Sequence, residues 1–165
     1  MADHPLTLYL RGHYAGGHTA IRRLREQATS DPINDRRTFL SALVTEIDAD
    51  LSTLQHVMKR LSVRPSPLRN ATASVAAVIG RWFLRAERPG EAQAILIGLE
   101  SLSLGIEGKA KLWRTLDEVS VTEPRLSGID FAGLTARARD QRERLETYRL
   151  AAALDAQGGS PATPA

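Results

Sequence analysis

The amino-acid sequence predicts an all-α fold with four long helices and one short helix. Apolar residues recur at spacings of three and four over several turns, which is the pattern of helices packed in a bundle. The chain contains no Asn-Gly or Asp-Gly hairpin turn and no sustained alternation of Val, Ile and Thr, so strands are not expected. Its 165 residues fit one domain, which we place at residues 1–155.

The first two long helices are expected over residues 5–28 and 35–61, on either side of the turn SDPIND. Pro5 suits the first turn of a helix, where its missing N–H costs nothing. The expected apolar seams run through Leu6, Leu10, His13, Gly17, Ala20 and Leu24, and through Leu40, Leu43, Ile47, Asp50, Leu54, Val57 and Leu61.

The segment SVRPSP then interrupts the helical pattern, and a shorter helix is expected over residues 70–87. After the turn at residues 88–90, two further long helices are expected, one ending near Val119 and one over residues 129–155. Their seams run through Ile95, Leu99, Leu102, Ile106, Lys109, Trp113 and Leu116, and through Phe131, Leu134, Ala138, Gln141, Leu145, Tyr148 and Ala152.

The short helix lies between the second and third long helices, where a four-helix bundle of crossover topology needs a connection along its whole length. A five-helix up-and-down array is the alternative. In its helix layout, and in the segments YLRGHYAGG and LESLSLGIEGKAKLW, the chain resembles the ferritin-like superfamily over residues 5–155. Within that superfamily it is similar to a group of small uncharacterised bacterial helical-bundle proteins. The resemblance implies a ferritin-like four-helix bundle with the short fifth helix in the crossover.

Four polar residues interrupt the apolar seams: His13, Asp50, Lys109 and Gln141. Burying such groups is costly unless they are paired, so we expect them to form a buried polar network. Counting residues from the turn between the first two helices places His13 level with Asp50. A hydrogen bond between these two side chains would satisfy both and set the register of the two helices.

Carboxylates near the same level also suggest a metal site. Glu46 shares a face with Asp50, and Glu100 shares a face with Glu107. Together with His13 they could hold iron or manganese, because carboxylate and imidazole ligands on facing helices form the di-metal sites of ferritin-like proteins.

The superfamily's ligand pattern is incomplete, however. It places a Glu-x-x-His motif on each of two helices, but Glu46 is followed three residues later by Ala49, and Glu100 by Ser103. We therefore give the purely structural network precedence over the metal site. No catalytic residues are predicted, because the chain has no cysteine, no nucleophile elbow and no P-loop.

The positive charge is concentrated in the middle of the chain. Residues 59–90 carry 7 basic and 1 acidic side chains, whereas the whole chain carries 22 and 19. The stripe formed by Arg81, Arg85 and Arg88 could contact phosphate or a protein partner. A nucleic-acid-associated bundle that uses these arginines is the second alternative, although the stripe is short and few aromatic residues accompany it.

The termini predict a protein without a leader or an anchor. The first residues lack the basic and apolar regions of a signal peptide, and no apolar stretch is long enough to span a membrane. We therefore expect a cytoplasmic protein, with a disordered tail over residues 156–165. Trp82 and Phe83 cannot both face inward, which suggests a homodimer. The expected role is that of a degenerate, non-catalytic binding or interaction module.

Overall fold

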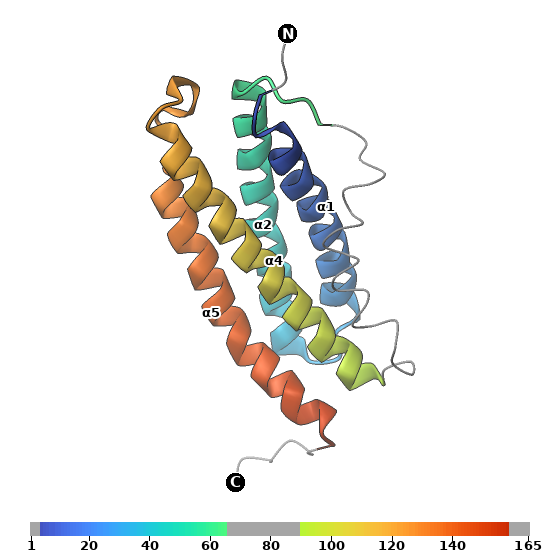
Figure 1. Ribbon diagram of the computed structural model, residues 1–165. Coiled ribbons are helices and arrows are strands. Elements are labelled where there is room, and N and C mark those ends of the chain that lie inside the picture. The colour runs from blue at the N-terminus through green and yellow to red at the C-terminus, as the bar shows by residue number, and fades with distance from the viewer. Residues whose placement is uncertain (1–3, 66–89, 159–165) are drawn as a thin grey trace.

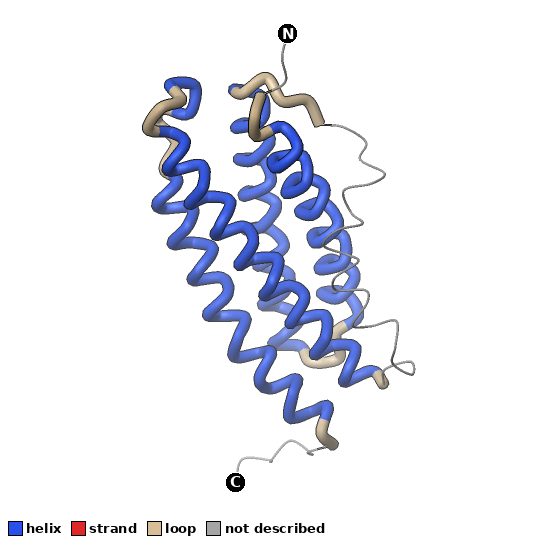
Figure 2. The backbone as a smooth tube through the Cα atoms, viewed as in Figure 1, coloured by secondary structure: helices blue, strands red, loops and turns tan. Residues whose placement is uncertain are grey.

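The computed structural model describes residues 4–65 and 90–158, and in these residues it is entirely helical (Figures 1 and 2). The described residues contain no strand, as predicted. The four long helices begin and end within two residues of their predicted limits. The expected helix over residues 70–87 and the tail beyond residue 158 lie outside the described residues. The elements are α1 (Thr7–Ser30), α2 (Asn34–Arg60), α4 (Glu91–Ser120), the short 3₁₀ helix η1 (Pro124–Leu126) and α5 (Phe131–Ala156).

The long helices form two antiparallel hairpins that lie side by side (Figure 1). α1 pairs with α2 and α4 pairs with α5, while α1 also packs beside α4 and α2 beside α5. α2 and α4 run in the same direction, so the chain leaves α2 at one end of the bundle and enters α4 at the other. In this arrangement α2 and α5 are neighbours with few close backbone contacts.

Short-range hydrogen bonds define the helix ends. The Asp130 carboxylate accepts a hydrogen bond from the Gly133 backbone N–H at 2.8 Å, which caps the start of α5. The Asp31 carboxylate accepts one from the Ile33 N–H at 3.0 Å in the turn between α1 and α2. Ser62 has a positive φ of 60°, a left-handed conformation that ends α2.

The core consists mainly of leucine side chains from all four long helices. Every residue of the predicted α2 seam is buried, from Leu40 to Leu61. Near η1, the rings of Trp113 and Phe131 lie 6.3 Å apart, and both are almost completely buried. The predicted seam of α1 needs a correction, because Ile21 is buried whereas Ala20 and His13 are only half-buried. α1 is therefore rotated relative to the expected orientation.

Gly17 of α1 lies in tight contact with Leu51 of α2. A Cβ atom at this position would lie 2.9 Å from Leu51 Cδ1, whereas one at Gly16 would meet no described atom within 4 Å. Gly17 therefore lies level with Leu51, and this contact sets the vertical register of the first hairpin.

We expect Gly16→Ala and Gly17→Ala to change the free energy of unfolding by different amounts or in opposite directions. At an open helical position alanine is more favourable than glycine by roughly 0.5–1 kcal/mol, so Gly16→Ala should increase the free energy of unfolding by about that amount. At Gly17 the gain is offset because Leu51 must move. Urea unfolding of both variants tests this contact, and an equal stabilisation by both would contradict the register.

Candidate functional site

The most unusual feature of the interior is the buried carboxylate of Asp50, which is 2% exposed. Lys109 Nζ from α4 donates to its Oδ2 at 2.5 Å. The guanidinium of Arg137 from α5 donates to its Oδ1. Gln141 Nε2, also from α5, lies 3.4 Å from Oδ2. One acid of α2 thus collects polar groups from both helices of the opposite hairpin.

Gln141 connects this carboxylate to a second one. Its side chain is completely buried, its Oε1 accepts a hydrogen bond from Lys109 Nζ at 2.5 Å, and its Nε2 donates to Glu46 Oε2 at 3.1 Å. The two contacts use the oxygen and the nitrogen of the amide in opposite roles, so its orientation follows from the network. Because buried polar groups are costly when unpaired, this pairing permits the amide to lie in the core.

Lys109 carries the interior positive charge. Burial lowers the pKa of its ammonium group, while the nearby Asp50 carboxylate acts in the opposite direction. Its side chain is 14% exposed. The ammonium group thus lies between two acceptor oxygens on different helices, as a small bound cation would.

Asp50 and Glu46 belong to a longer series of polar contacts, which we call the α2–α5 ladder. Glu46 Oε2 also accepts a hydrogen bond from Arg144 at 2.7 Å, and this contact raises the pKa of the arginine. α2 and α5 have few close backbone contacts, so long side chains bridge them. From one end of the bundle to the other, the ladder comprises Arg60 with the Ser127 carbonyl, Asp50 with Arg137, Glu46 with Arg144, Asp35 with Tyr148, and Arg36 with Asp155.

Of the residues proposed as metal ligands, Glu46 and Asp50 both contact Gln141, but Glu100 and Glu107 pair elsewhere. Glu100 pairs with Arg149 at 3.2 Å, and Glu107 pairs with Arg142, both on the outer side of the α4–α5 hairpin. Within residues 4–65 and 90–158, no group of three or more His, Asp or Glu side chains is arranged to hold a metal ion. The donor set therefore does not fit the di-metal centre that a ferritin-like resemblance implies, and the acids near the interior are occupied by basic side chains.

The predicted pairing of His13 with Asp50 is wrong. His13 makes an edge-on contact with Tyr9, with ring centroids 4.6 Å apart, and the partners of Asp50 come from α4 and α5. The prediction assumed that Ala28 and Asp35, on either side of the α1–α2 turn, lie at the same height in the bundle. In the structure Gly17, rather than His13, lies level with Leu51 and hence with Asp50. The other three members of the predicted buried network, Asp50, Lys109 and Gln141, do meet.

Sequence reasoning missed Arg137 and Arg144, which complete the network. Both lie on the same face of α5 as Gln141, four residues before it and three residues after it. In the sequence, this spacing from a polar seam residue is the feature that could have indicated their part in the network. The arginines proposed for phosphate or partner contact, Arg81, Arg85 and Arg88, lie outside the described residues.

Comparisons with protein families, with curated proteins and with solved structures find no match for this chain. We therefore infer its function from its own residues.

We expect Asp50→Asn to lower the free energy of unfolding by roughly 2–4 kcal/mol, because it leaves two cationic side chains without their buried counter-charge. Glu107→Gln is the matched control. Its surface pair should contribute less than about 1 kcal/mol. Chemical denaturation measures both, and an Asp50→Asn cost no greater than that of Glu107→Gln would contradict a structural role for the network.

His13 should make stability depend on pH. Burial lowers its pKa below 6.5, so the unfolded chain binds a proton that the folded chain does not as the pH falls through 6.5. Stability should therefore fall between pH 7 and the lowered pKa, and His13→Gln should reduce this fall. Unfolding titrations at several pH values measure it, with exposed His18→Gln as the control. Identical pH profiles for wild type and His13→Gln would disprove the assignment.

Proposed function

We propose that the chain is a non-catalytic helical bundle of the ferritin-like type that works as a binding or interaction module. The observation that carries this proposal is the Lys109 ammonium, which lies between Asp50 and Gln141 at 2.5 Å from each. The positive charge of Lys109 compensates the negative charge of the Asp50 carboxylate, which is the role that a bound metal ion would have in a metal site. The interior network then serves stability rather than chemistry.

The helix arrangement supports the ferritin-like part of the proposal. Two antiparallel hairpins lie side by side, and α2 and α4 run in the same direction (Figure 1). A crossover connection between the second and third long helices produces this relation, which is the topology of ferritin-like bundles. The five-helix up-and-down array, which produces the same helix directions, is the alternative.

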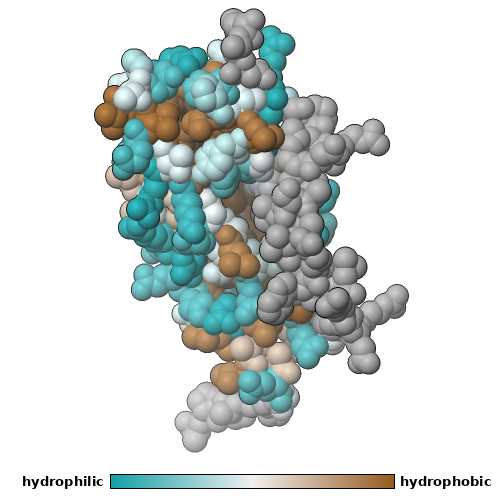
Figure 3. Space-filling view, in the orientation of Figure 1, coloured by the Kyte–Doolittle hydropathy of each residue, from teal (hydrophilic) through white to brown (hydrophobic). Residues whose placement is uncertain are grey.

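The surface supports a role in contact with other molecules. The described residues expose six large apolar side chains: Leu8, Ile33, Leu104, Val121, Leu150 and Leu154. On the face shown in Figure 3, apolar residues lie toward both ends of the bundle, with a smaller apolar spot among the hydrophilic and neutral residues of the middle. Exposed apolar groups at the ends are suited to protein contact, including the proposed homodimer. In the parts of the chain that are described, no helix is both long and apolar enough to cross a membrane.

Metal analysis tests the proposal against its main alternative, a metal-binding protein that uses iron or manganese. We expect protein purified under mild conditions to carry no stoichiometric iron, manganese or zinc, and to bind none of them below millimolar concentration in calorimetric titration. The reason is that Lys109, Arg137 and Arg144 already compensate the interior acids.

The alternative predicts a different result. Stoichiometric metal that is lost in both His13→Ala and Asp50→Ala, while circular dichroism shows that the helices persist, would overturn the non-catalytic proposal. Asp117→Asn serves as a control here, since it changes an exposed acid of α4 that is not among the proposed ligands.

A further inference from the structure

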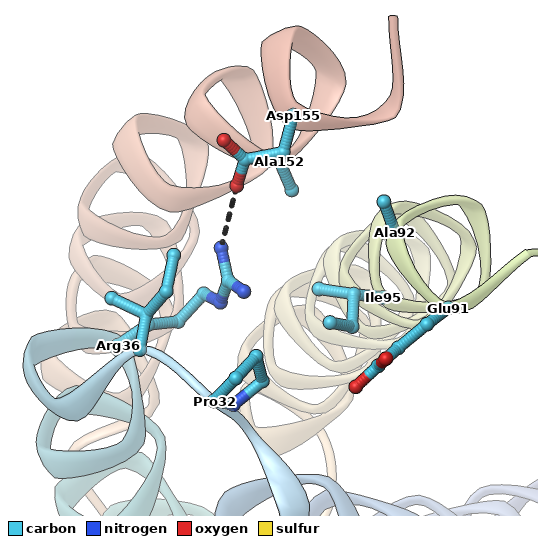
Figure 4. A pocket seen from close by; sticks show the side chains of 8 residues that line it. Pro32, Arg36, Glu91, Ala92, Ile95, Ala152 and Asp155 are labelled. Carbon is cyan, nitrogen blue, oxygen red and sulfur yellow. Dashed lines mark ion pairs between the residues drawn. The ribbon is translucent and has the colours of Figure 1, made fainter. Parts of the chain in front are cut away.

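A cavity of about 330 Å³ lies at the end of the bundle where the α1–α2 turn, the start of α4 and the end of α5 meet (Figure 4). Its walls are mostly apolar and include Pro32, Ile95 and Ala152. Ligand cavities in proteins range from about 300 to 1,000 Å³, so this one suits a molecule much smaller than a typical drug. The cavity is separate from the Asp50 network, which lies near the middle of the helices.

Arg36 is the central polar group of the cavity. The residue is 2% exposed, and its Nε donates to the buried Asp31 carboxylate at 2.6 Å, which fixes the guanidinium in place. One outer nitrogen, Nη1, points toward Asp155 of α5 (Figure 4). Nη1 lies 3.6 Å from Asp155 Oδ2, too far for a direct hydrogen bond.

Most of the hydrogen-bonding capacity of Arg36 is therefore unused within the described residues. A guanidinium group has five N–H donors, and one of them is engaged here. Arg36 lines the cavity, and the free edge of an arginine matches both oxygens of a carboxylate. A carboxylate group in the cavity would supply acceptors for these donors.

The other charges of the cavity restrict the class of ligand. Asp31 already neutralises Arg36, while Asp155 and Glu91 add two negative charges on the α5 and α4 sides. Neither of these two acids accepts a hydrogen bond from a described side chain. A simple carboxylate would be repelled by them, whereas a molecule that also carries an ammonium group would be attracted.

We propose that this cavity binds a small apolar amino acid or a zwitterion of the same kind. Its carboxylate accepts hydrogen bonds from the outer nitrogens of Arg36, its ammonium group faces Asp155 and Glu91, and its aliphatic part packs on Ile95 and Pro32. This inference rests on the proposed function, since it names the ligand of a binding module.

Leucine is the test ligand, followed by nuclear magnetic resonance through the backbone amides of Ile33, Ala92 and Ala152. We expect saturable shifts with leucine. Affinity should be at least roughly tenfold weaker for 4-methylpentanoate, which lacks the ammonium group, and for 3-methylbutylamine, which lacks the carboxylate, because each loses one charge-assisted contact.

Variants assign the contacts within the cavity. Asp155→Asn should weaken leucine binding by roughly tenfold through loss of a charged partner, and Ala152→Leu should abolish it by filling the space. Asp117→Asn, which changes an exposed acid of α4 away from the cavity, should leave binding unchanged. Asp155 is 35% exposed, so its variant is expected to fold.

Each contrary result overturns the inference. Absence of saturable shifts with leucine rejects the site. Equal affinity for leucine and either single-charge analogue, or unchanged binding in Asp155→Asn, rejects the zwitterion class. Metal content is measured on the same preparation. Bound metal together with leucine binding would refute the proposed function alone, and metal-free protein without leucine binding would refute this inference alone.

Discussion

The buried carboxylate of Asp50 is the constraint on which the arrangement of the two hairpins depends. An isolated carboxylate in an apolar core is very unfavourable, so the fold must bring positive charge and hydrogen-bond donors to it. Lys109 supplies them from α4 and Arg137 from α5. The apolar seams tolerate a slip along the helix axis more easily than this network does, because many leucine contacts are interchangeable whereas a charge pair is not. We infer that the network selects one register for the hairpins.

The same constraint explains why α5 is so rich in charge. A helix that is polar on most of its surface cannot be held by apolar packing alone. In α5 the buried side is formed largely by small or polar residues such as Ala138 and Gln141, and the arginines reach sideways to acids of α2 and α4. Individually, exposed pairs contribute little to stability. The contribution of the α2–α5 ladder therefore depends on its buried members, Asp50 and Arg36.

The parts of the structure that the sequence could predict are those that depend on helical period. The leucines of α2 recur at three and four residues, and the same periodicity predicts the polar residues that interrupt the seams, Asp50 in α2 and Gln141 in α5. The orientation of α1 could not be found in this way, because its small residues permit a rotation that turns His13 partly away from the core. Arg137 escaped because a long side chain reaches the network from outside the seam.

The buried charged groups Asp50 and Arg36 differ in whether their polar atoms can contact a ligand. At Asp50, both carboxylate oxygens have donors from the neighbouring helices, so nothing remains for a ligand. At Arg36, the hydrogen bond to Asp31 uses a single N–H, Nη1 faces Asp155 at 3.6 Å, and the side chain lines a cavity. Both charged groups are balanced by opposite charges, but only at Arg36 does the charged side chain also line a cavity. A fold that holds an arginine rigidly with its outer donors free has a prepared contact for an acceptor. Binding is therefore better sought at the end of the bundle than at its charged centre.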